Sequence, residues 1–258
     1  MDMIDKLRNL RLKLLTGSVA STKWGPEMYV SEPFEAQMAR GEFESSALSE
    51  FISLISKGEF ERFGDVGAHV GIYGLVFKHN VAGYVDAFEP LPWSTGSLHR
   101  NYCINGYDDY TIRRAAVLDS VGEVEMKFNP EHSVEASTIE ETYSGGATYS
   151  LSVEATTLDE YYDERPTPDV LKIDVEGGER AVLDGAVELL STTPDLFVEI
   201  HQSLIDDPQE TLAAMDSHLS DAGYDQIRHV ERGGSVERLA DLSGETDELT
   251  HVHVVNNN

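Results

Sequence analysis

The chain has 258 residues, 40% of them hydrophobic, which is enough for one large α/β domain with a buried core. Its 47 aspartates and glutamates outnumber its 19 lysines and arginines, and the formal net charge of −28 repels nucleic-acid phosphates. No basic patch offsets this repulsion, so we predict no nucleic-acid partner. The acids are spread from end to end, which favours adaptation to a salt-rich cytoplasm over an ordinary acidic protein.

Residues 1–60 are predicted to form a helical cap on a unit of residues 61–258. In the first segment, lysines and arginines interleave with leucines at near-helical spacing, so this helix could lie on an anionic membrane surface. Packing on the domain is favoured instead, because such a membrane would repel the rest of this acidic chain. Residues 17–33 are polar and contain glycine and proline, and residues 34–55 return to helical spacing.

Cellular location is predicted from what the sequence lacks. Cys103 is the one cysteine, which excludes an intramolecular disulfide and a cysteine metal cluster. Neither a secretory signal nor an apolar run of about 18 residues is recognisable, so we expect a soluble, cytoplasmic protein.

From Arg62 onward, short apolar runs alternate with helical patterns, which is typical of a parallel sheet wrapped by helices. A further antiparallel pair is expected at the sheet edge. The pattern predicts a Rossmann-like α/β fold with a seven-stranded, mostly parallel sheet and an antiparallel C-terminal hairpin. The expected strands are residues 63–66, 84–88, 111–117, 170–173, 196–200, 226–230 and 252–255.

A β-like pair at residues 123–128 and 150–155 is predicted between the third and fourth strands of the sheet. It flanks a Ser/Thr/Gly-rich loop at residues 133–148. Loops of this length are usually lids or binding loops, and a disordered surface excursion is the alternative.

The first candidate site is the turn Asp65-Val66-Gly67-Ala68-His69-Val70-Gly71, at the carboxyl end of the first expected strand. Gly67 would let the backbone approach a ligand, Gly71 would let the next helix pack closely, and Asp65 would face the ligand's polar groups. The turn has one glycine fewer than the dinucleotide motif, which argues against a bound pyrophosphate. S-adenosylmethionine fits better, because it has no phosphate and its positive charges would face a carboxylate.

Glu89, at the end of the second expected strand, strengthens this interpretation, because its carboxylate could accept both hydroxyls of a ribose. Two other classes of function stay open: a nicotinamide or nucleotide-sugar enzyme on a similar sheet, and a catalytically silent module that keeps a cofactor pocket as scaffold.

The residues resemble FkbM-type methyltransferases across residues 62–201 and more weakly to residue 224. The resemblance includes the turn at Asp65, Phe88-Glu89-Pro90, Leu98-x-x-Asn101-x-x-x-Asn105-Gly106, Leu171-Lys172-Ile173-Asp174-Val175-Glu176-Gly177-Gly178-Glu179, and Phe197-Val198-Glu199-Ile200-His201. It implies a class I methyltransferase fold and methyl transfer from S-adenosylmethionine to a hydroxyl or carboxyl of a sugar, glycan or small polar metabolite. It also implies these cofactor-binding residues: Asp65, Gly67, Ala68, His69, Gly71, Glu89, Pro90 and Asn101. His69 departs from the family, which commonly has a small or amide residue there.

The catalytic candidates lie at or just after the carboxyl ends of the fourth and fifth expected strands, which meet the edge where Asp65 and Glu89 lie. They are Lys172, Asp174, Glu176, Glu199 and His201. Methyl transfer needs a deprotonated oxygen about 3 Å from the methyl carbon, so a general base is required. His201 has an ordinary pKa near neutrality, and mutual repulsion could raise the pKa of Asp174 or Glu176. Lys172 is expected to pair with one of these acids.

The same acids suggest a second role. Asp174, Glu176 and Glu199 could instead bind Mg²⁺, which favours clustered carboxylates. Glu179 is expected near the first turn of a helix, where a negative charge is favourable even without a functional role.

Overall fold

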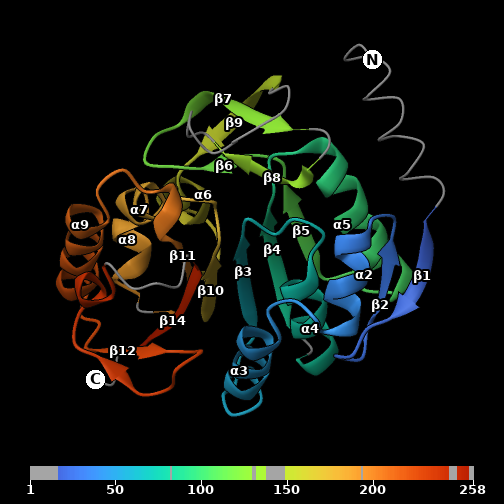
Figure 1. Cartoon of the computed structure of the whole chain (residues 1–258), viewed down its shortest axis with the longest axis horizontal. Coiled ribbons are helices and arrows are strands. Elements are labelled where there is room, and N and C mark those ends of the chain that lie inside the picture. The colour runs from blue at the N-terminus through green and yellow to red at the C-terminus, as the bar shows by residue number, and fades with distance from the viewer. Residues whose placement is uncertain are drawn as a thin grey trace.

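The computed structural model describes residues 17–81, 83–129, 132–137, 149–192, 194–243 and 249–255 (Figure 1). The amphipathic helix predicted before residue 17 lies outside the described residues. Within the described residues, every helix is too short or too polar to cross a bilayer.

A large mixed sheet forms the centre of the molecule, in the order β13-β12-β14-β11-β10-β3-β4-β5. Five strands are parallel, namely β3 (Arg62–Val66), β4 (Tyr84–Phe88), β5 (Tyr110–Arg113), β10 (Val170–Ile173) and β11 (Asp195–His201). Strand β14 (Leu249–Val255) lies antiparallel between β11 and β12 (Gln226–His229). The described residues give eight strands instead of the predicted seven, because the two-residue strand β13 (Ser235–Val236) extends the edge.

A smaller sheet lies across the carboxyl ends of the parallel strands, at the top of Figure 1. It consists of β6 (Ala116–Val117), β7 (Gly122–Asn129), β8 (His132–Ser137) and β9 (Tyr149–Thr156). The strand predicted at residues 111–117 is therefore divided, because the chain turns after Arg113 and Ala116 pairs with β9. The predicted β pair corresponds to β7 and β9. Of the predicted loop, residues 133–137 belong to β8, and residues 138–148 lie outside the described residues.

Within the predicted helical cap, residues 18–30 form strands, in the segment that the sequence showed as polar and interrupted by glycine and proline. Strands β1 (Ser18–Ser21) and β2 (Glu27–Val30) form a hairpin there, closed by a hydrogen bond from the Thr22 amide to the Pro26 carbonyl. Gly25 and Pro26 permit this tight turn, and helical spacing begins only after it. The helices of the cap are α2 (Pro33–Arg40) and α3 (Ser45–Ile55).

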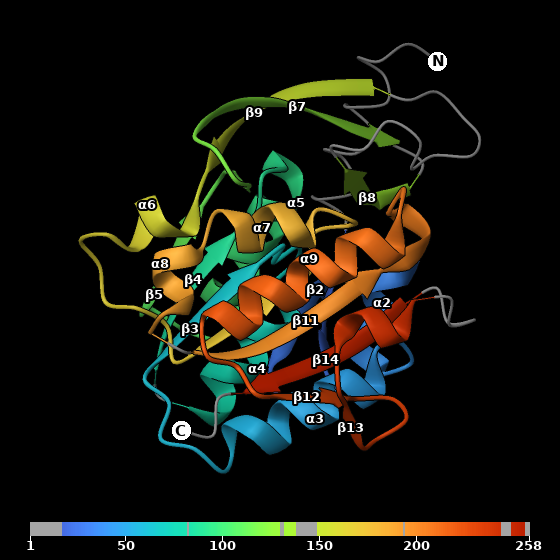
Figure 2. The ribbon, with the colours of Figure 1, turned by 90° about the vertical axis from the view of Figure 1, so that its left-hand side faces the viewer.

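Helices cover both faces of the large sheet, and each face has its own hydrophobic core (Figures 1 and 2). One face carries α3, α4 (Ile72–Asn80) and α5 (Pro92–Ile104). The other carries α6 (Leu158–Tyr162), α7 (Glu179–Asp184), α8 (Val187–Leu190) and α9 (Pro208–Asp221), with the 3₁₀ turns η1 (Gln202–Leu204) and η2 (Leu239–Leu242) nearby. Phe51 of α3 lies 5.1 Å from Phe63 of β3, ring centre to ring centre. The cap therefore shares a core with the sheet, which positions its loops over the strand ends.

Candidate functional site

A cavity of about 270 Å³ opens at the carboxyl ends of the parallel strands. Its walls come from the segments after β3, β4, β10 and β11, from the small sheet, and from the cap. Among the predicted site residues, those that line it are Gly67, Ala68, His69, Glu89, Pro90, Lys172, Asp174, Glu176, Glu199 and His201. Most of the predicted residues therefore lie around one cavity, as expected for residues at the carboxyl ends of neighbouring parallel strands.

The turn after β3 is held in place by backbone contacts with the neighbouring strand ends. The amides of Gly67 and Ala68 both donate to the Phe88 carbonyl at 3.0 Å. Gly67 has φ 78°, and a Cβ at this position would lie 1.6 Å from the Asp174 carbonyl oxygen. The structure thus requires this glycine for contact with the segment after β10, whereas the sequence suggested approach of a ligand.

Replacement of Gly67 by alanine is expected to reduce the free energy of unfolding by about 3 kcal/mol, because left-handed strain adds to the steric overlap with Asp174. Gly106 is a matched control, since its φ is 68° and a Cβ there has no neighbour within 4 Å. Gly106→Ala should cost only the strain, about 1 kcal/mol. Urea unfolding of both variants measures the difference, and equal losses would contradict the close contact at Gly67.

Glu89 connects the turn to the end of β4 through both carboxylate oxygens. Oε2 accepts from the His69 amide at 2.9 Å, and Oε1 accepts from the Leu91 amide at 2.8 Å. Burial raises the pKa of Glu89 to about 7, although these amides lower it. Each oxygen keeps a second lone pair on a cavity wall, which fits the hydroxyls of a ribose. Burial lowers the pKa of His69 to about 4, so its ring is uncharged at neutral pH and would not repel a cationic ligand.

Three residues of the predicted cofactor set lie outside the cavity wall. Gly71 begins α4 with φ 85°. Asp65 is buried beneath the turn, next to Lys172 in the register of β3 and β10, and burial raises its pKa to about 6. Asn101 donates to the Val70 carbonyl at 2.8 Å and accepts from the Tyr29 amide at 2.7 Å. Asp65 is therefore shielded from direct contact with the cavity, and Asn101 holds the hairpin of the cap against the turn.

Three of the predicted catalytic residues surround the ring of a fourth, His201. Its Nε2 lies 3.5 Å from Glu176, 3.6 Å from Glu199 and 3.8 Å from Asp174. Its Nδ1 lies 2.9 Å from Oε1 of Glu179, which also accepts from the Gly177 amide. Glu179 is fully buried at the start of α7, so it fixes the orientation of the imidazole.

Lys172 forms the ion pair that the sequence suggested, with its Nζ 2.6 Å from Asp174. Burial alone would raise the pKa of Asp174, but Lys172 and His201 lower it overall. Of the two acids whose pKa the sequence allowed to be raised, Asp174 is therefore not the one. At Glu176, burial raises the pKa to about 7, with smaller contributions from Asp174 and Glu199, while His201 lowers it.

His201 is a poor general base in this environment, although its ordinary pKa suggested it. Burial would lower its pKa, but the hydrogen bond to Glu179 and the charges of Asp174 and Glu176 raise it to about 10. The imidazole is therefore protonated at neutral pH and compensates the surrounding carboxylates. Glu176 is the cavity-lining group that changes charge near neutrality in this cluster.

Among the acidic residues that line the cavity in the described part of the chain, Glu44 is the one that sequence reasoning missed. Glu44 precedes α3 with φ 46°, and Tyr73 of α4 donates its hydroxyl to Glu44 at 2.9 Å. Burial and the charge of Glu199 raise the pKa of Glu44 to about 7. No local pattern around Glu44 could identify it, because the fold of the cap alone brings it to the strand ends.

The sequence profile described as "Methyltransferase FkbM domain" matches residues 65–225, which is more than half of the chain. No curated protein matches the chain in sequence. A putative transferase, PH0793 of Pyrococcus horikoshii, is 12% identical with a TM-score of 0.51, and the match covers 93% of this chain and 70% of that one. TYW2 of P. horikoshii, solved in complex with MeSAdo, has the same identity and coverage and a TM-score of 0.50. The methyltransferase FkbM of Methylobacillus flagellatus is 14% identical with a TM-score of 0.49. The match covers 98% of this chain and 60% of that one.

Proposed function

The chain belongs to the FkbM methyltransferase domain family, and from this premise we propose that it transfers a methyl group from S-adenosylmethionine to an oxygen atom. The proposed acceptor is a hydroxyl or carboxyl of a sugar, glycan or small polar metabolite. The observation that carries the proposal is a single cavity that holds both the turn with Glu89 and the acids around His201. A cofactor site and a proton acceptor are thus within reach of one substrate.

The residues at the turn fit S-adenosylmethionine. Glu89 would accept from the ribose hydroxyls, and Ala68, His69 and Pro90 would form the wall around it. The buried charge of Asp65 would favour a cationic ligand over a phosphate. When bound, the cofactor supplies a methyl carbon that its sulfonium charge activates.

The acids on the other wall would prepare the acceptor. Glu176 would take the proton of the acceptor hydroxyl at a carboxylate oxygen, because its pKa of about 7 lets it accept a proton at neutral pH. Lys172 keeps Asp174 ionised, and Glu179 keeps His201 in a fixed orientation. Mg²⁺ bound by Asp174, Glu176 and Glu199 is not part of this proposal, because the Lys172 ammonium and the His201 imidazolium already compensate these acids.

Replacement of Glu89 by alanine is expected to weaken binding of S-adenosylhomocysteine by about 10- to 100-fold, because two hydroxyls lose an acceptor and the turn loses its contact at His69. Isothermal titration measures this, and the exposed acid Glu59 provides the control variant Glu59→Ala, which should bind normally. Tighter binding of NAD than of S-adenosylhomocysteine by the unmodified protein would favour the nicotinamide alternative.

Methyl transfer itself is tested with an extract from cells that lack the gene, whose acceptors are unmethylated. The extract receives the purified chain and S-adenosylmethionine with a labelled methyl group. We expect label in the glycan or small-molecule fraction, and none in RNA if the acidic surface excludes nucleic acid. Normal binding of S-adenosylhomocysteine without any transfer would instead identify a silent cofactor-binding module.

A further inference from the structure

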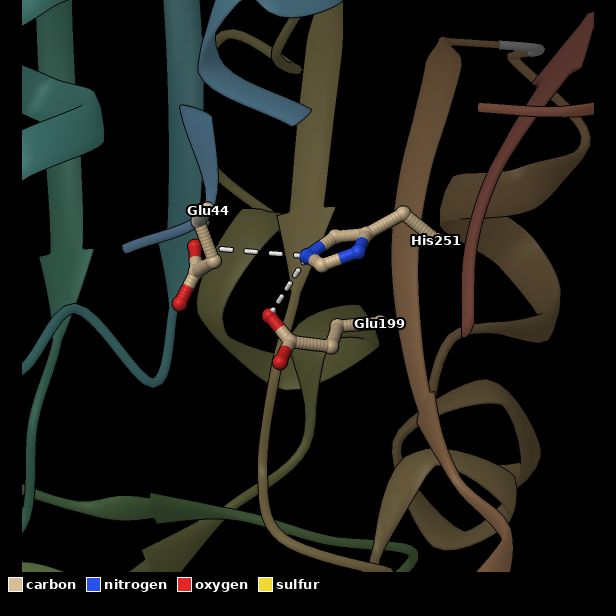
Figure 3. Close-up of side chains that lie close together, drawn as sticks. All are labelled: Glu44, Glu199 and His251. Atoms are coloured by element: carbon tan, nitrogen blue, oxygen red, sulfur yellow. Dashed lines mark hydrogen bonds and ion pairs between the residues drawn. The ribbon is translucent and has the colours of Figure 1, made fainter. Parts of the chain in front are cut away.

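The geometry points to a metal site on the cavity wall: we propose that Glu44, Glu199 and His251 bind one divalent cation (Figure 3). These three side chains come from the loop before α3, from β11 and from β14, and Figure 3 shows them pointing toward one another. The proposal concerns binding of the metal alone, so it does not depend on methyl transfer.

The spacing of the three side chains suits one ion. Nε2 of His251 lies 3.0 Å from Glu199 Oε2 and 3.9 Å from Glu44 Oε2, and one donor atom from each residue lies within 4.8 Å of the others. Donors bound to one cation at about 2.1 Å lie about 3 to 4 Å from each other. Glu199 and His251 are directly paired across β11 and β14, so this part of the site is rigid.

Residues behind the cluster hold its donors in the orientation that a metal requires. Glu231 lies outside the three and contacts His251 twice, accepting from its backbone amide at 3.2 Å and lying 2.5 Å from its Nδ1. A carboxylate on the outer nitrogen is the usual partner of a metal-binding histidine, because it fixes the ring and directs the other nitrogen at the ion. Tyr73 likewise orients Glu44 through its hydroxyl.

The charges nearby distinguish this cluster from a second set of similar spacing, formed by Asp174, Glu176 and His201. There, the Lys172 ammonium forms a direct ion pair with one of the three candidate ligands, Asp174, at 2.6 Å and would repel a cation bound beside it. The same ammonium acts on Glu44 and Glu199 through its charge, and its direct ion pair among the described residues is the one with Asp174. Around His251, the directly contacting partners are the three acids Glu44, Glu199 and Glu231. His201 contacts Oε1 of Glu199, whereas the oxygen that faces His251 is Oε2. A divalent cation would compensate the charge at Oε2 together with the charges of Glu44 and Glu231.

The donor set indicates the class of metal. One imidazole nitrogen with two carboxylates suits cations that accept both nitrogen and oxygen, such as Mn²⁺, Fe²⁺ or Zn²⁺, better than Mg²⁺ or Ca²⁺, which prefer oxygen alone. Glu44 and Glu199 line the cavity, so open coordination positions would face it. If the proposed methyl transfer holds, such an ion could bind the acceptor's oxygen.

The test uses the full chain, freed of metal with a chelator and titrated with Mn²⁺, whose free form is measured by electron paramagnetic resonance. We expect a single tight site, and nitrogen modulation of the bound signal that disappears in His251→Gln. Glu199→Gln and His251→Gln should weaken binding at least about tenfold, and Glu231→Gln by about 10- to 100-fold. Absence of a tight site in the unmodified chain would overturn the proposal.

Matched variants locate the ion. His253 lies two residues along β14 from His251 and is buried beside the same Phe197 ring, so His253→Gln should leave Mn²⁺ affinity unchanged. Loss of binding in His201→Gln, with normal binding in His251→Gln, would place the metal at the other cluster and overturn the proposal. If the sheet variants fail to fold in chelator, Glu44→Gln decides, because Glu44 lies in a loop of the cap.

Discussion

Replacement of Glu176 by glutamine is expected to slow methyl transfer by about 10²- to 10⁴-fold, because glutamine keeps the shape of the side chain and cannot accept the acceptor's proton. Glu176 lines the cavity, and its side chain is 30% exposed, so an acceptor can reach it. Affinity for S-adenosylhomocysteine should be unchanged, since the hydrogen bonds that hold Glu89 against the turn do not involve Glu176. The measurement is incorporation of labelled methyl into the acceptor fraction, with the exposed Glu164→Gln as control.

The pH dependence of the rate provides a second test of Glu176. Burial raises its pKa to about 7, and the base acts when deprotonated, so the rate should rise with pH up to about 7 and level off above it. Below that pH, the rate should fall about tenfold per pH unit. Glu176→Gln should remove this rise. A rise that persists in Glu176→Gln and disappears in His201→Gln would identify His201 as the base and contradict the pKa of about 10 that its neighbours impose.

Side chains that follow predicted strands could be placed from the sequence. The buried runs identified β3, β4, β10 and β11, and parallel strands end at one edge of a sheet, so Glu89, Asp174 and His201 were expected to converge. Asn101 lies on a helix whose cavity-facing side the sequence does not reveal, and its amide turned out to hold backbone groups.

The remaining parts of the site depend on contacts between distant segments. Glu44 reaches Glu199 only because α3 packs on the sheet through Phe51, and His251 reaches Glu199 because β14 inserts beside β11. The protonation state of His201 likewise depends on residues that only the folded chain brings together. The ordinary pKa of histidine suggested a base at His201, and the carboxylates around the ring reverse that expectation.

Replacement of Lys172 by methionine is expected to lower the free energy of unfolding by about 4 kcal/mol near neutral pH, because it leaves buried carboxylates without their cation. Lys172 is 3% exposed and forms the ion pair with Asp174, and the neighbouring Asp65, Glu199 and Glu44 raise its own pKa, although burial opposes this. Methionine keeps the apolar stem, so most of the loss should be electrostatic. Urea unfolding measures it, and the exposed Lys57→Met should change stability by less than about 0.5 kcal/mol.

The loss in Lys172→Met should depend on pH in a direction that separates charge from packing. Without the ammonium, the pKa values of Asp65 and Asp174 rise in the folded protein, whereas in the unfolded chain they stay near 4. Between about pH 4 and 7, the folded variant then binds more protons than the unfolded chain, so its stability increases as the pH falls. The difference from the unmodified protein should therefore be smaller at about pH 5.5 than at about pH 8. An equal difference at both values would mean that Lys172 stabilises the sheet by packing alone, and the ion pair with Asp174 would then not be what keeps this acid ionised.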